Sequence, residues 1–434
     1  MKSAKPVVSK EYLFPFILIT SLFALWGFAN DITNPMVAAF KTVMEIPNSE
    51  AALIQFAFYG GYATMAIPAA LFVKKYSYKK GILLGLALYA VGALLFYPAA
   101  MYEKFGFFLA SLYILTFGLA FLETTANPYI ISMGDEETGT RRLNLAQAFN
   151  PVGSILGMIV ASQFILSNLW SDKRDAAGNL IFPTLPETEK AVIRAHDLAV
   201  IRDPYVILGF VVIAMFIIIA VSKMPKRKNA DHNVRTLDSF RRLAKNPHYR
   251  EGVIAQVFYV AAQIMNWTFI IQYAENLGID KATAQNYNII AMILFLSSRF
   301  ISTFLMKYFK PKVLLTVFAI GGIITMLGTI FIQGMGGLYC LIATSAFMSL
   351  MFPTIYGIAL EGLKEDTTLG AAGLVMAIVG GALMPPLQGA IIDLGTVFGM
   401  PAVNFSFVLP LFSFVVIAWY GYRVQKEKRV VTAQ

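Results

Sequence analysis

An acid and an amide, Glu123 and Asn127, lie inside a strongly apolar stretch of the chain. The apolar run from about 105 to 133 is long enough to cross a membrane, and a carboxylate buried there costs roughly 3 kcal/mol on insertion scales. The two side chains are one helical turn apart on the same face, and Pro128 cannot donate a backbone N–H to the carbonyl of Thr124. These features predict a polar site inside a helix bundle. Because a glutamate shielded from water can hold a proton near neutral pH, Glu123 is a candidate for proton coupling.

A second acid, Asp31, lies in the first apolar stretch, three residues before Asn34. This spacing places both side chains in one direction, and we expect them to face a cavity. An alternative is that Asp31 lies near the outer end of its helix, reaches water and caps or pairs with a neighbour. The alternative for Glu123 is a structural ion pair with Arg142 or Arg299.

Amide side chains recur every three residues in the fifth apolar stretch, at Asn144, Gln147 and Asn150, before Pro151 interrupts it. An amide offers a donor and an acceptor without charge, which matches sugar hydroxyls. A stripe that bonds only to neighbouring helices is the alternative. The second half supplies the same chemistry at Gln263, Asn266 and Trp267. The indole could stack on the apolar face of a pyranose, although tryptophan in membrane helices is often interfacial or used in packing.

The elements that carry these residues are membrane-spanning helices. With 57% hydrophobic and 14% charged residues, the 434-residue chain is too apolar for a soluble protein. We predict an all-α membrane protein with twelve transmembrane helices in two six-helix bundles, because open strands cannot satisfy their backbone in lipid. The predicted spans are 12–40, 51–73, 81–101, 105–133, 143–166, 205–223, 252–273, 282–306, 313–333, 338–363, 369–394 and 402–422.

These spans define an N-terminal bundle at 12–223, a linker at 224–250 and a C-terminal bundle at 251–423. The basic residues set the orientation: with both termini cytoplasmic, 26 lysines and arginines fall inside and 8 outside. The net charge of +10 is thus a topology signal and an anchor for anionic lipid, not a sign of nucleic-acid binding. The basic linker is expected along the inner surface. The outer loop at 167–202, with a helix-like run from 187 to 200, is expected to be a solvated cap.

Several kinds of chemistry are excluded by what the sequence lacks. A single cysteine, Cys340, rules out an internal disulfide or a thiolate metal cluster, and the three histidines lie in polar connecting segments. No phosphate-binding or dinucleotide-binding glycine motif is present, so we expect no cofactor, no metal and no enzymatic activity. Energy for any transport must then come from an ion gradient.

The two halves repeat each other, which is typical of a transporter with its site near mid-membrane between two bundles. A basic turn follows the second span of each half, at 71–80 and 304–312, and Trp26 and Trp267 lie in the first span of each half. Paired carboxylates within the membrane favour a solute:proton symporter over a non-transporting membrane sensor. The amides suit a sugar better than the lipophilic cation of a drug exporter.

Several longer motifs together resemble the fucose:proton symporter branch of the major facilitator superfamily. They lie at 22–30, 53–62, 122–128, 142–150, 262–263 with Trp267, 346–349 and 352–354. The resemblance covers nearly the whole chain, and it implies inward transport of a 6-deoxy or related hexose with a proton across a bacterial inner membrane. Other hexoses remain open, including glucose, galactose and amino sugars. We expect sugar, proton and membrane lipid as partners, and a monomer.

The resemblance also implies roles for individual residues. Glu123 takes the place of the family's proton-coupling glutamate, and Gln147 and Asn150 take the places of its sugar-binding amides. The family's coupling aspartate aligns with Asn34, whereas this chain carries its aspartate one turn earlier, at Asp31. A shift of three residues keeps the side chain within about 60° of its former direction, so we expect Asp31 to inherit the coupling role.

Overall fold

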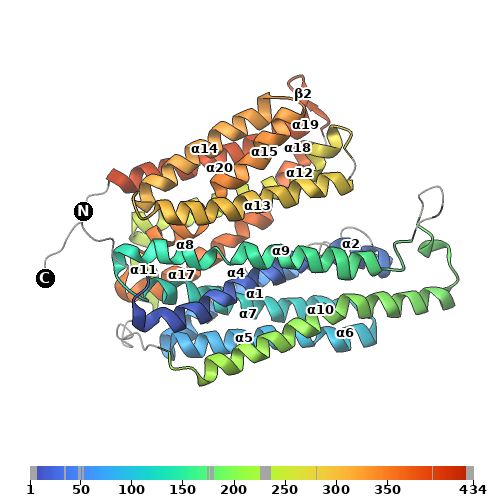
Figure 1. The fold of residues 1–434 in the computed structure, drawn as a ribbon, viewed down its shortest axis with the longest axis horizontal. Helices are drawn as coiled ribbons and strands as arrows, with labels where there is room; N and C mark the ends of the chain where they lie inside the picture. The colour runs from blue at the N-terminus through green and yellow to red at the C-terminus, as the bar shows by residue number, and fades with distance from the viewer. Residues whose placement is uncertain are drawn as a thin grey trace, which may run out of the picture. The chain divides into compact units, whose positions relative to one another are not determined.

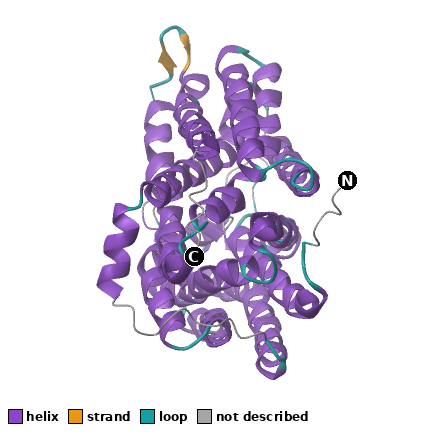
Figure 2. Ribbon diagram, turned by 90° about the vertical axis from the view of Figure 1, so that its left-hand side faces the viewer, coloured by secondary structure: helices purple, strands orange, loops and turns teal. Residues whose placement is uncertain are grey.

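The fold is almost entirely helical in the computed structural model (Figures 1 and 2). The structure describes residues 7–33, 36–46, 50, 53–173, 175, 180–224, 236–279, 281–392 and 394–426. Within these ranges twelve helical segments are long and apolar enough to cross a membrane, which confirms the predicted number. The exception is a short antiparallel hairpin of β1 (Thr396–Val397) and β2 (Met400–Pro401), drawn in orange in Figure 2.

Several spans are built from two consecutive helices. The first six spans comprise α1 (Leu13–Thr33) and α2 (Met36–Val43), α4 (Leu53–Lys75), α5 (Tyr78–Leu94) and α6 (Phe96–Tyr102), α7 (Phe105–Ile131), α8 (Gly139–Gln147) and α9 (Asn150–Val160), and α10 (Glu187–Val221). The linker contains α11 (Thr236–Lys245). The last six comprise α12 (Pro247–Asn276), α13 (Lys281–Leu305), α14 (Pro311–Phe331), α15 (Met335–Met348) and α16 (Met351–Ala359), α17 (Thr367–Met376) and α18 (Gly380–Ile392), and α19 (Ala402–Ser406) and α20 (Val408–Lys426).

The contacts divide the chain into two compact units. One unit contains Met1–Phe16, Asn127–Ala148 and Asn229–Gln434, and the other contains Ile17–Ala126 and Phe149–Lys228. The last turn of α7 and the whole of α8 therefore pack with the helices of the second half. The sequence-based division at 224–250 follows chain topology and stays a prediction.

In the unit that contains Ile17–Ala126, α1 and α9 approach each other backbone to backbone. A Cβ atom added at Gly153 would lie 1.7 Å from the carbonyl oxygen of Ala24, and one added at Gly27 would lie 2.0 Å from the carbonyl oxygen of Asn150. Small residues at helix interfaces permit this close packing in membranes, where dispersion contacts replace the hydrophobic effect as the cause of association. The sequence thus fixes how closely the broken fifth span lies against the first.

The sixth span begins much earlier than predicted. The prediction started it at 205 and assigned 187–200 to a separate helix-like run, but α10 is one helix of 35 residues, visible in green in Figure 1. Pro204 lies inside it. A proline removes only one backbone hydrogen bond, and here the helix continues through it.

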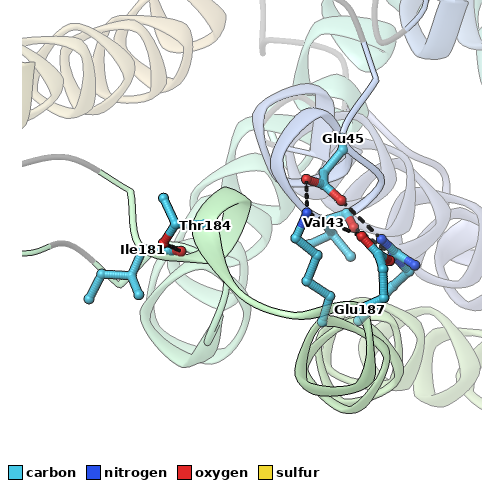
Figure 3. Close-up of polar contacts among 7 residues, drawn as sticks. Val43, Glu45, Ile181, Thr184 and Glu187 are labelled. Carbon is cyan, nitrogen blue, oxygen red and sulfur yellow. Dashed lines mark hydrogen bonds and ion pairs between the residues drawn. The ribbon is translucent and has the colours of Figure 1, made fainter.

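Ion pairs tie the first turns of α10 to the end of α2, as Figure 3 shows. The Lys190 ammonium lies 2.8 Å from one carboxylate oxygen of Glu45, and Arg194 lies 3.1 Å from the other and also donates to the carbonyl oxygen of Val43. Asp197 is fully buried and accepts backbone N–H bonds from residues 170 and 171. The first turns of α10 are thus bound to the segment after α2 and to the loop after the fifth span, and the solvated cap stays a prediction.

The linker helix α11 is anchored to the start of α17. Arg242 donates two hydrogen bonds to the carboxylate of Asp366, at 2.7 and 2.8 Å. Two parallel bonds of this kind fix the orientation of an arginine as well as its position. The bonds between Arg242 and Asp366 hold α11 against the unit that contains Asn229–Gln434. The location of this basic linker along the inner surface stays a prediction.

Candidate functional site

Glu123 is half-buried in α7, which runs without a break through Asn127 and Pro128. Its carboxylate lies near the phenol of Tyr62 on α4. Asp31, on α1, is only 6% exposed and lies near Tyr59, one turn before Tyr62. Asp31 is therefore not a water-exposed cap. One face of α4 presents a phenol to each acid, and phenols can both donate and accept hydrogen bonds.

The tyrosines were not singled out from the sequence, although Tyr59 and Tyr62 lie in one of the motifs that carry the resemblance. Their spacing of three residues was the available signal, because it places both on one helix face. Asn34, the other residue expected beside Asp31, lies outside the described residues.

The two arginines considered as partners of Glu123 have other partners. Arg142 is fully buried and donates to the carbonyl oxygens of Ile130, at 2.7 Å, and of Ile131, at the C-terminal end of α7. It also reaches the carbonyl oxygen of Val7, at 2.9 Å. A cation at this position satisfies carbonyls that the helix leaves unpaired. Arg142 thus holds the end of α7 against the N-terminal segment.

The amides of the fifth span have three different environments. Gln147 donates from Nε2 to Oδ1 of Asn127 at 2.9 Å, and both side chains are buried. The Nδ2 group of Asn127 has no hydrogen-bond partner among the described residues, so it remains a free donor. Asn144 instead donates to Thr354 of α16 at 3.1 Å, which is the helix-to-helix contact that the alternative interpretation describes.

Asn150 follows the break between α8 and α9 and donates to the carbonyl oxygen of Phe23 on α1 at 3.3 Å. The expected stripe of Asn144, Gln147 and Asn150 therefore does not lie on one uninterrupted helix. The physical reason is Pro151, which cannot donate to the carbonyl of Gln147, so the helix ends three to four residues before the proline rather than at it.

In the second half, Asn266 and Trp267 both bind α15. Asn266 is buried and contacts the Met348 sulfur from Nδ2 at 3.2 Å, while its Oδ1 has no hydrogen-bond partner among the described residues. The Trp267 indole donates to Ser345 at 3.2 Å and packs edge to face on Phe295. Gln263, on the same helix α12, is half-buried. The Oδ1 atom of Asn266 is thus available to accept a hydrogen bond from a ligand, and the Nδ2 group of Asn127 is available to donate one.

Arg299, the other arginine considered as a partner for Glu123, also binds backbone carbonyls. It lies on α13 with 3% of its surface exposed. It donates to the carbonyl oxygens of Gln147, at 3.0 Å, and Ser349, and its guanidinium lies 4.6 Å from the ring centroid of Phe295. It therefore binds backbone next to the candidate sugar-binding amide Gln147.

The helices, their broken spans and the two groups of buried polar side chains are the features of a membrane transporter. The Major Facilitator Superfamily model matches residues 17–385, and the chain therefore belongs to this family. It is 72% identical to the L-fucose-proton symporter of Haemophilus influenzae, covering 97% of this chain and 98% of that protein. It is 37% identical to the L-fucose-proton symporter of Escherichia coli, covering 89% and 88%.

A solved structure agrees with these relatives in fold. The crystal structure of the Major Facilitator Superfamily transporter FucP in the outward conformation matches with a TM-score of 0.87 and 34% identity, covering 96% of this chain and 100% of that one. The expected fold class, twelve transmembrane helices of the major facilitator fold, is thereby confirmed.

Proposed function

We propose that this protein is a proton-coupled sugar symporter that imports L-fucose across the bacterial inner membrane by alternating access. The observation that carries the proposal is the placement of Asp31 and Glu123, two carboxylates within apolar spans on separate helices, α1 and α7, of one unit. Acids within membrane spans are costly and mark proton relays in transporters. The two relatives named L-fucose-proton symporter, each matched over most of its length, support the choice of solute.

In this proposal Glu123 and Asp31 bind and release the coupled proton. The sugar is bound by amides, with the free Nδ2 of Asn127 as a donor and the free Oδ1 of Asn266 as an acceptor. Gln147 orients Asn127 through the bond at 2.9 Å, and Asn150 and Gln263 contribute further polar groups. Trp267 offers an aromatic surface for the apolar face of the sugar. The distribution of basic residues supports a cytoplasmic location for both termini in this proposal.

Sugar-driven alkalinisation tests the proposal directly. Weakly buffered cells that express the chain should take up protons when L-fucose is added, and the external pH should rise. Glucose, galactose and amino sugars added in the same way define the selectivity, and cells with the empty vector are the control. A pH rise with galactose but not with L-fucose would move the solute to another hexose. No rise with any hexose would contradict proton-coupled sugar transport.

A further inference from the structure

Two backbone carbonyls in the middle of membrane spans are left without a partner by prolines. In a continuous helix the carbonyl of Gln147 would accept from residue 151, and the carbonyl of Ser349 would accept from residue 353. Both positions are proline, which has no N–H. Each span breaks there: α8 ends at Gln147 and α9 begins at Asn150, while α15 ends at Met348 and α16 begins at Met351. Such breaks also occur between α5 and α6, before Pro98, and between α19 and α20, before Pro410, but the carbonyls of Gln147 and Ser349 share one partner.

One side chain binds both of these carbonyls. Arg299 donates from Nη1 to Gln147 at 3.0 Å and from Nε to Ser349. A guanidinium can do this because it is planar and carries five N–H groups in a fixed geometry, which the single ammonium of lysine lacks. The C-terminal ends of two helices also carry partial negative charge, which stabilises a buried cation. Among the described residues no carboxylate forms an ion pair with Arg299, so its charge faces these two helix ends and the ring of Phe295.

We propose that Arg299 is a positioning residue that latches the broken fifth span to the broken tenth span in the conformation of this structure. The proposal deepens the proposed transport function, because alternating access requires α8 to leave the second half. The bond to Ser349 lies within the second half and can persist through the cycle. The bond to Gln147 must break when α8 moves away. Because its acceptor is the backbone carbonyl of Gln147, whose side chain is a candidate sugar-binding amide, the bond links the movement of α8 to the sugar site.

The packing of α8 on α16 supplies a probe for the latched state. Thr140 is 6% exposed, and a Cβ atom added at Gly357 of α16 would lie 2.7 Å from its hydroxyl oxygen. A cysteine at position 140, in a chain whose single native thiol is removed by Cys340→Ser, would be covered while the latch is closed. The rate of its alkylation by N-ethylmaleimide in membranes therefore reports how often α8 leaves α16, without sugar.

We expect Arg299→Lys to raise the alkylation rate by about tenfold or more, because at least one charge-assisted hydrogen bond is lost. Pro151→Ala restores an N–H donor for the Gln147 carbonyl within the helix, and it should raise the rate in the same direction. Because both substitutions remove the same bond, the double variant should react within about twofold of Arg299→Lys alone. Pro68→Ala, inside α4, is the matched control and should leave the rate unchanged.

The outcomes separate the latch from other roles. An unchanged rate in Arg299→Lys, or effects of the two substitutions that multiply in the double variant, would overturn the proposal. An arginine that only contacts sugar would change L-fucose binding and leave alkylation at the parent rate. Pro151→Ala keeps the arginine, so it tests the latch even where Arg299→Lys does not reach the membrane. Failure of the parent to transport L-fucose would overturn the proposed solute and leave the alkylation result standing.

Discussion

The hydrogen bond between Gln147 and Asn127 allows a quantitative test of the sugar site. Gln147→Ala removes the donor to Asn127 Oδ1, and Asn127 is fully buried with its Nδ2 group already free. A buried polar group that loses its partner costs about 1–3 kcal/mol, and the freed amide is no longer held in one orientation. If Asn127 binds sugar through Nδ2, this loss of orientation should weaken binding by about tenfold, since each tenfold corresponds to about 1.4 kcal/mol.

Calorimetry with L-fucose on purified protein measures this effect. Asn127→Ala and the double variant complete a cycle in which the double variant should bind within about twofold of the weaker single variant, because the two amides act as one unit. Asn144→Ala is the matched control, since it removes an amide one turn earlier that bonds to α16 and should leave affinity within about twofold. Unchanged affinity in Gln147→Ala and Asn127→Ala would refute the reasoning and assign this bond to structure alone.

Three further predictions follow from the acids and the packing. Glu123→Gln should abolish proton-driven accumulation of labelled L-fucose while exchange continues, because the glutamine keeps shape and hydrogen bonding but cannot carry the proton; accumulation at the parent level would contradict its coupling role. Asp31→Asn should also lose accumulation, and adding Asn34→Asp should restore it; normal uptake in the single variant would leave Glu123 to couple alone. Gly153→Val should sharply reduce folded protein after detergent extraction, because its Cβ would lie 1.7 Å from a carbonyl oxygen of α1; Gly106→Val, with no atom within 4 Å, is the control that should not.

Much of the fold is predictable from the sequence because a membrane-spanning helix requires an apolar run of about 20 residues. Apolar length gives their number, and the twelve predicted spans are all present. The helix-like run from 187 to 200 was predicted, but its continuity with the apolar span was not, since its first turns are polar, Pro204 lies between the two parts, and the ion pairs to Glu45 are tertiary contacts. The long helix shows that a polar loop and an apolar span can belong to one element.

The candidate site was predictable in residue type but not in pairing. Glu123 and Gln147 are marked by polarity within apolar runs, whereas the bond from Gln147 to Asn127 requires two helices to meet. Arg299 illustrates the harder case. Its partners are backbone carbonyls, which every residue carries, so only the prolines four residues beyond Gln147 and Ser349 could have indicated them.

The long helix α10 has a mechanical consequence. Its first turns are bound to the end of α2 through Glu45, and at its other end Lys79 at the start of α5 donates to the carbonyl oxygens of Ala220 and Ser222. At 1.5 Å per residue, its 35 residues form a rod about 52 Å long that is clamped at both ends. A long helix that is bound at both ends resists bending, so a displacement of one end moves the other end as well. Spin labels on α10 and α5 should keep their separation throughout turnover, which makes this pair a fixed ruler against which the movements of other helices can be measured.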